Sequence, residues 1–182
     1  AALLFLGLLA VACLARDAGP AVLVVRSLSR HPYIVSLAAF VAFSIGAVLV
    51  YGDHALSMDE YSSRFQSEIF AAGQLTANLP PELLDWLVPP SFQGKFLIAS
   101  RPSGQVVSYF MQGFSLLLTP FTYLGIPWAC NPALGALSVL AIHRLACELA
   151  GTEEAGGWAM LFALASPAFS INAMSYYSMS AN

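Results

Sequence analysis

Two adjacent acids, Asp59 and Glu60, are the residues of this sequence best placed to do chemistry. They stand in the stretch Met58-Asp59-Glu60-Tyr61, shortly after the uncharged apolar run Tyr33–Gly52. Carboxylates held in water at the edge of a bilayer suit a general base that takes a proton from an acceptor hydroxyl or amine, or that orients this acceptor. The alternative is a pair of solvated acids that cap the first turn of a loop helix, where the helix dipole favours negative charge.

Arg101 is the second candidate, in the turn Arg101-Pro102-Ser103-Gly104. A guanidinium offers bidentate geometry to a phosphate, such as that of a lipid-linked substrate. The alternative is an arginine that extends its charged end from an interfacial segment into water. The same loop carries two further basic residues, Arg64 and Lys95, which we expect to contact substrate together with Tyr61.

The composition places these residues in an integral membrane protein. Of the 182 residues, 58% are hydrophobic and 9% are charged, far below the quarter or so of charged residues that is usual in a soluble domain. The net charge of −3 and the lack of a basic cluster exclude a nucleic-acid partner. The three cysteines lie singly in apolar stretches, which predicts small buried residues without a metal.

The apolar runs predict an all-α, multi-pass helical bundle. We expect a truncated span at about 1–15 and full spans at about 33–52, 133–150 and 158–175, the last kinked at Pro167. Three arginines precede the span at 33–52, so the positive-inside rule places them in the cytoplasm and Asp59 outside. We treat residues 1–182 as one incomplete domain, because the sequence begins without Met and stops directly after a membrane segment.

The predicted extracytoplasmic loop covers about 53–132 and contains two juxtamembrane helices. Residues 59–73 carry apolar side chains at helical spacing and end at Gly73, which predicts an amphipathic helix at the membrane surface. Two proline pairs frame Glu82–Leu87, which predicts a short interfacial turn or helix. Residues 106–126 are long enough to span a bilayer. The charged residues at the far end of 133–150, however, favour entry of that span from the outside, so we expect 106–126 to stay on the outer side as a juxtamembrane helix.

An ordered set of motifs extends beyond the acid pair. After Met58–Tyr61 come Ala72–Leu75, Ser100–Gln105, Leu124–Trp128 with Asn131-Pro132, and Ser175–Ser180. From Tyr33 to Asn182 this order resembles bacterial glycosyltransferases of the GT-C superfamily, in the branch of the protein O-mannosyltransferases and aminoarabinose transferases.

The resemblance implies transfer of a sugar from a polyprenyl-phosphate-linked donor to a lipid, glycan or protein acceptor, on the outer face of the bacterial cytoplasmic membrane. It implies that Asp59 is the catalytic or acceptor-orienting acid, that Glu60 is its neighbour, and that Arg101 contacts the donor phosphate. We further expect Tyr176 and Tyr177 to contact substrate, since their patch lies on the predicted outer side. A divalent cation beside Arg101 would help the phosphate to leave, although no ligand cluster is visible in the sequence.

The sequence departs from the family pattern at two places, and two other classes of protein are alternatives to a glycosyltransferase. Relatives often read Pro-Pro-Gly where this chain has Pro102-Ser103-Gly104, and many carry a His where it has Ala181-Asn182, so either altered substrate choice or lost activity is compatible with the resemblance. A transporter or flippase-like protein would carry acids near the middle of its spans, and the predicted spans hold none there. A non-catalytic assembly subunit would tolerate replacement of Asp59.

Overall fold

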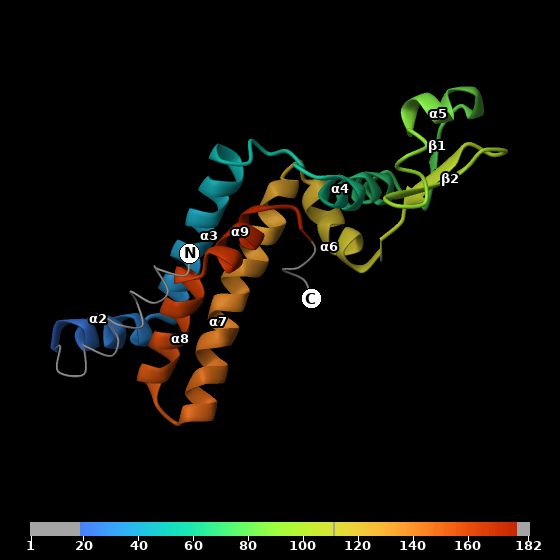
Figure 1. Ribbon diagram of the computed structural model, residues 1–182. Coiled ribbons are helices and arrows are strands. Elements are labelled where there is room, and N and C mark those ends of the chain that lie inside the picture. The colour runs from blue at the N-terminus through green and yellow to red at the C-terminus, as the bar shows by residue number, and fades with distance from the viewer. Residues whose placement is uncertain (1–18, 111, 178–182) are drawn as a thin grey trace. The chain divides into compact units, whose positions relative to one another are not determined.

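The computed structural model describes residues 19–110 and 112–177, and it is mostly helical with a small three-stranded sheet (Figure 1). The chain divides into two compact units, one formed by Ala1–Ile45 with Pro132–Met174 and the other by Gly46–Asn131 with Ser175–Asn182. We call them the helical unit and the loop unit. The predicted truncated span at about 1–15 lies outside the described residues.

The helical unit contains the candidate membrane spans. Two spans are long and apolar enough by themselves, Pro32–Leu49 (helix α3) and Pro127–Ala150, which joins the 3-10 turn η3 (Pro127–Ala129) to α7 (Cys130–Ala150). A third arises if α8 (Glu153–Ala165) and α9 (Pro167–Met174) count together, bent by 68° where the kink at Pro167 was predicted. The break has a physical cause, because a proline lacks the N–H that a continuous helix needs. The described chain is therefore that of a membrane protein with two or three candidate spans.

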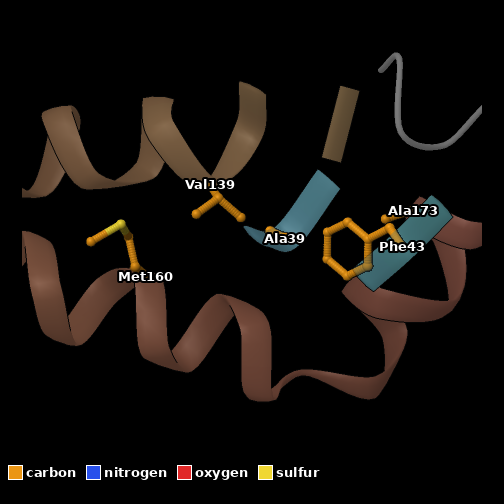
Figure 2. Packing of buried hydrophobic residues seen from close by; sticks show 5 residues of the cluster. All are labelled: Ala39, Phe43, Val139, Met160 and Ala173. Atoms are coloured by element: carbon orange, nitrogen blue, oxygen red, sulfur yellow. The ribbon is translucent and has the colours of Figure 1, made fainter. Parts of the chain in front are cut away.

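Small side chains let the helices of this unit approach closely. Figure 2 shows its core, in which Phe43 of α3 and Val139 of α7 pack with Met160 of α8 and Ala173 of α9. A Cβ atom added to Gly135 would lie 2.7 Å from the Ala173 Cβ and 3.2 Å from the Phe43 ring, so only glycine fits there.

The predicted cytoplasmic loop before α3 contains a helix, α2 (Gly19–Arg30). Its Arg26 pairs with Glu154, and its Ser29 Oγ donates to the Glu153 carbonyl oxygen at 2.6 Å, both at the start of α8. At the N-terminal end of α3, the Tyr33 hydroxyl accepts a hydrogen bond of 2.7 Å from Arg144 of α7. Charged residues that the sequence analysis assigned to the cytoplasm thus meet in polar contacts within this unit.

The loop unit corrects the all-α prediction. Strands β1 (Ala77–Asn78), β3 (Gln105–Ser108) and β2 (Leu97–Ser100) form an antiparallel sheet in the order β1-β3-β2. The β2–β3 hairpin pairs Ser100 with Gln105 and Leu97 with Ser108. Apolar residues at alternate positions explain the sheet, because Leu97 and Val106 point into a core that they share with Leu84 and Val88.

The segment 106–126 is therefore not one helix. It starts within β3 and continues as α6 (Gln112–Tyr123), a 12-residue helix that is not among the candidate spans of the described chain. Periodicity alone did not reveal the strand, since a short continuous apolar run fits a buried strand as well as a segment of an apolar helix. The short helical turn predicted at Glu82–Leu87 is present as η2 (Pro81–Leu83) and α5 (Leu84–Leu87).

Gly104 ends the hairpin turn where a second segment crosses it. Its φ of +70° lies in the left-handed region, and an added Cβ would lie 1.9 Å from the Leu79 carbonyl oxygen. The Leu79 N–H donates to the Gly104 carbonyl oxygen at 2.8 Å, which holds the two segments together. Both the backbone conformation and the space available therefore require glycine at this position.

Candidate functional site

The two acids of the Asp59-Glu60 pair have different surroundings at the start of α4 (Met58–Ala71). The Glu60 side chain is buried, and its Oε2 accepts a hydrogen bond of 2.6 Å from the Leu56 N–H while the Ser57 Oγ accepts from the Glu60 N–H. The arrangement resembles a capping box, although the Glu60 carboxylate accepts from Leu56, the residue before the N-cap Ser57, so Glu60 holds the entry to α4. Asp59 is exposed and makes no hydrogen bond or ion pair with the described residues, which leaves its carboxylate open to a ligand.

The buried face of α4 is polar. Ser62 Oγ donates to the Phe96 carbonyl oxygen at 2.6 Å, and Ser67 Oγ lies 2.8 Å from Thr122 Oγ1 of α6. Gln66 accepts from the Ser108 N–H at 2.8 Å and donates to the Leu75 carbonyl oxygen at 3.1 Å. These serines and Gln66 thus fix α4 to the sheet and to α6, while Tyr61 and Phe65 of α4 line a groove.

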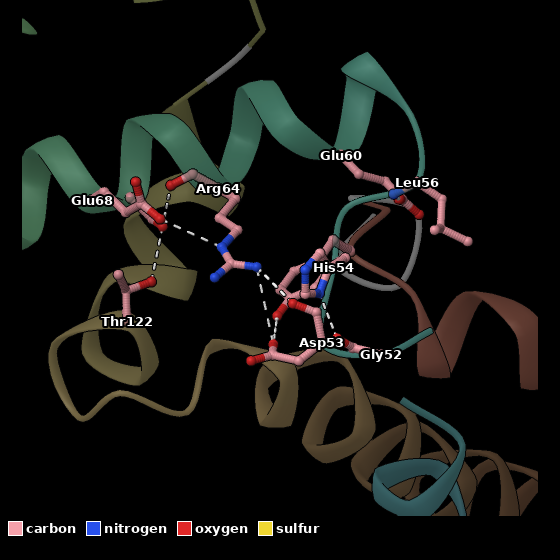
Figure 3. A network of polar contacts seen from close by, with 10 residues as sticks. Gly52, Asp53, His54, Leu56, Glu60, Arg64, Glu68 and Thr122 are labelled. Atoms are coloured by element: carbon pink, nitrogen blue, oxygen red, sulfur yellow. Dashed lines mark hydrogen bonds and ion pairs between the residues drawn. The ribbon is translucent and has the colours of Figure 1, made fainter. Parts of the chain in front are cut away.

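Arg64 is the centre of a polar network on α4 (Figure 3). Its Nη1 donates to the Asp53 carbonyl oxygen at 2.8 Å and lies 4.0 Å from the Asp53 Oδ1, while its Nε lies 3.4 Å from the Glu68 Oε1. The guanidinium also stacks over the Tyr176 ring, 5.4 Å from its centroid. These contacts fix the orientation of the guanidinium, as recognition of a planar anion requires.

Asp53 connects this network to the chain after α9, and the sequence analysis did not identify it. Its Oδ1 accepts a hydrogen bond from the Tyr176 hydroxyl, which joins residues 123 positions apart. It is the one non-glycine residue of the described chain with a positive φ, +56°, in a turn that follows Gly52. The only signal in the sequence is this Gly-Asp pair just after a span, which is typical of an ordinary turn.

The tyrosines around the network have raised pKa values. Burial, followed by the hydrogen bond to the Asp53 carboxylate, raises the pKa of the Tyr176 phenol, while Arg64 lowers it by a smaller amount. Burial raises the pKa of Tyr51, with further contributions from Glu60 and Tyr177. Both phenols therefore stay neutral near pH 7 and act as hydrogen-bonding groups, not as anions. Tyr51 is a second residue near the network that the sequence analysis did not identify.

Tyr61 lies between two cavities of different character. One is an apolar groove of about 380 Å³, lined by Met58, Tyr61, Phe65, Leu79, Leu87, Val88, Pro89, Phe92 and Leu97. The other is a polar pocket of about 360 Å³, lined by Asp53, His54, Ala55, Tyr61, Arg64 and Glu68. Because Tyr61 lines both, the apolar groove and the polar pocket adjoin at the first turn of α4.

The other predicted substrate-binding residues lie apart from the polar pocket. Arg101 is exposed and its Nη2 lies 3.2 Å from the Asp85 Oδ1, while Lys95 is exposed without a partner in the described chain. Neither residue lines either of the two cavities. The Tyr177 carbonyl oxygen accepts from the Asn131 Nδ2 at 2.8 Å, which anchors the segment that carries Tyr176. The structure thus brings Tyr61, Arg64 and Tyr176 together and leaves Arg101 and Lys95 on the β2–β3 hairpin and the turn before it.

A metal centre does not fit the described residues. Within 19–110 and 112–177, no three side chains of His, Cys, Asp or Glu gather in a way that would hold a metal ion.

No family model, no curated protein and no solved structure matches this chain.

Proposed function

We propose that this protein is a membrane glycosyltransferase, which moves a sugar from a polyprenyl-phosphate-linked donor to an acceptor on the extracytoplasmic face. The observation that carries the proposal is the junction of an apolar groove with an arginine-containing polar pocket at Tyr61. The exposed Asp59 lines neither cavity and stands two residues before Tyr61 in the first turn of α4. A donor of this class matches these two adjoining cavities, because it joins an apolar prenyl chain to an anionic phosphate and a polar sugar.

Each part of the donor has a counterpart in the loop unit. The prenyl chain lies in the groove among Phe65, Phe92 and Leu97, where burial of apolar surface favours binding. The phosphate lies in the polar pocket against Arg64, where it takes the place of the exposed Glu68 carboxylate on the guanidinium while Asp53 and Tyr176 keep the guanidinium oriented. Preorganised groups of this kind stabilise developing charge without reorganisation during the reaction.

The transfer step then needs one base. The acceptor oxygen or nitrogen attacks the anomeric carbon of the sugar, its proton passes to the Asp59 carboxylate, and the bond between that carbon and the phosphate oxygen breaks. The departing polyprenyl phosphate keeps the electron pair, and Arg64 offsets the charge. Glu60 supports the step indirectly, because its capping hydrogen bond holds the first turn of α4 that presents Asp59.

The proposed orientation rests on the charges of the helical unit. The contacts of Arg26 with Glu154 and of Arg144 with Tyr33 gather basic residues near the N-terminal end of α3, and basic residues favour the cytoplasm. A helix that starts there and crosses the bilayer delivers the chain after Leu49 to the outer side. In this topology the loop that carries Asp59 faces the exterior of the cell.

The test is consumption of a polyprenyl-phosphate sugar by the reconstituted protein. We expect Asp59→Asn to lower kcat by about 10²–10⁴, as is usual for loss of a general base. Arg64→Gln should instead weaken binding of polyprenyl phosphate alone, measured without acceptor. Glu82→Gln is the matched control, because Glu82 is an exposed acid of the same unit that lies in η2 and not in the first turn of α4.

Equal turnover by wild type and Asp59→Asn would refute the role of Asp59 as the base. If the wild-type protein neither consumes the donor nor binds polyprenyl phosphate, the glycosyltransferase proposal itself fails.

A further inference from the structure

An exposed apolar surface on the loop unit borders the apolar groove. It consists of Leu83, Trp86 and Leu87, whose exposed fractions are 50%, 88% and 55%, and we call these three residues the apolar tip. Their neighbours Leu84 and Val88 are buried in the core with Leu97 and Val106, so η2 and α5 are fixed to the sheet (Figure 1). A tryptophan this exposed on a fixed element marks an interaction surface.

Of the two acids in η2 and α5, Asp85 is paired, while Glu82 is exposed and makes no ion pair with the described residues. The Asp85 Oδ1 accepts from the Arg101 Nη2 at 3.2 Å and from the Gln93 Nε2 at 2.9 Å. Lys95, on the turn before β2, is exposed and has no partner among the described residues. The described chain around the tip therefore carries one paired acid, one unpaired acid and one unpaired lysine, and Lys95 is the charge that anionic lipid headgroups attract.

The chain on either side of this unit identifies the partner. The unit follows the candidate span Pro32–Leu49 and is followed by the candidate span Pro127–Ala150. Residues tethered at both ends to a bilayer meet lipid at a far higher effective concentration than they meet a separate protein. Tryptophan also prefers the headgroup level of a membrane, because its ring is apolar and its N–H needs a polar partner.

We propose that the apolar tip inserts into the boundary between headgroups and acyl chains of the leaflet next to the loop unit. Leu87 belongs both to the tip and to the wall of the apolar groove, so insertion opens the groove to the hydrocarbon. A lipid chain then enters the groove from the membrane without crossing water. Insertion does not depend on the glycosyltransferase proposal and would hold for a protein with another activity.

Fluorescence of Trp86 tests this proposal in the whole chain. The chain has three tryptophans, so Trp128→Phe and Trp158→Phe together leave Trp86 as the only emitter. The protein is reconstituted into vesicles of phosphatidylcholine and phosphatidylglycerol, with or without bromine on the acyl chains. We expect blue-shifted emission that brominated chains quench strongly and aqueous acrylamide quenches weakly.

Two variants test whether the apolar tip itself drives the insertion. The double variant Leu83→Asp with Leu87→Asp should shift the Trp86 emission to the red. Quenching of Trp86 by brominated acyl chains should become weak, and quenching by acrylamide should become strong. The matched control Leu75→Asp changes another exposed leucine of the same unit, outside the tip, and should leave the emission of Trp86 unaltered.

Three outcomes would overturn the proposal. The first is quenching of Trp86 by acrylamide and not by brominated lipid, which would place the tip in water. The second is protection from both quenchers at low protein density, which would mean that a protein or a second copy covers it. The third is unchanged bromine quenching in the double aspartate variant. If the double phenylalanine background fails to fold, a nitroxide on Trp86→Cys, in a chain whose native cysteines are alanine, reports the same depth.

Discussion

The hydrogen bond from Tyr176 to Asp53 should stabilise the loop unit measurably. Tyr176→Phe removes the hydroxyl and keeps the ring under Arg64, so it isolates this one bond. Tyr177→Phe is the matched control, because the Tyr177 hydroxyl makes no hydrogen bond with the described residues while the residue lies next in the chain.

The size of the effect follows from the surroundings of the two groups. A hydrogen bond to a charged group contributes about 1.5–3 kcal/mol to stability. The Asp53 side chain is 39% exposed, so water replaces part of what the phenol supplies. We therefore expect a loss of about 1–2 kcal/mol in the free energy of unfolding. Tyr176→Leu should cost about 0.5–1 kcal/mol more, because it also removes the cation–π contact with Arg64.

Thermal unfolding of the detergent-solubilised protein, followed by circular dichroism, measures these losses. A loss of 1 kcal/mol corresponds to a fall in Tm of about 2–4 °C for a chain of this size. The expected order of stability is Tyr177→Phe, then Tyr176→Phe, then Tyr176→Leu. If Tyr176→Phe unfolds at the same temperature as Tyr177→Phe, the hydrogen bond to Asp53 does not hold the segment after α9, and our description of the network is wrong.

Three further predictions follow from the loop unit. Gln66→Leu should cost about 1–3 kcal/mol, because a buried backbone N–H loses its acceptor; the exposed Gln74→Leu should cost far less in the same melting assay, and equal costs would contradict this. Gly94→Ala should cost about 1–2 kcal/mol for its positive φ alone, whereas Gly104→Ala adds a backbone clash and should reduce the yield of folded protein; similar behaviour of both would refute the crowding at Gly104. Stability should fall as pH rises above 10, since the unfolded chain loses the Tyr176 proton first when the folded pKa is raised; Tyr176→Phe should flatten this slope, and an unchanged slope would exclude Tyr176 as its source.

The sequence alone was enough to predict the helices that are candidates to cross a membrane. A long uncharged run such as 33–52 has no other stable form in lipid, because its backbone polar groups must be satisfied within the segment. The break at Pro167 was also predicted, since a proline lacks the N–H that a continuous helix needs, although α6 continues through Pro120. These features depend on composition and local backbone chemistry, which a single chain carries in full.

The loop unit shows where such prediction stops. Val106 and Val107 belong to a strand because Ala77 pairs with Val106 and Ile98 pairs with Val107, and these partners lie 29 and 9 positions away. The buried polar face of α4 likewise depends on acceptors supplied by the sheet and by α6. Local propensity does not carry this information, so tertiary contacts decided both features.

For the candidate site, too, the sequence predicted some features and tertiary contacts decided others. Adjacent acids after a span pointed to Asp59 and Glu60, but only the structure separated an exposed carboxylate from a buried cap. The approach of Tyr176 to Asp53 joins segments more than a hundred residues apart, and no spacing in the sequence encodes it. The sequence thus determined which groups were available for chemistry, and the fold determined which of them meet, because side chains distant in the chain come together only through packing.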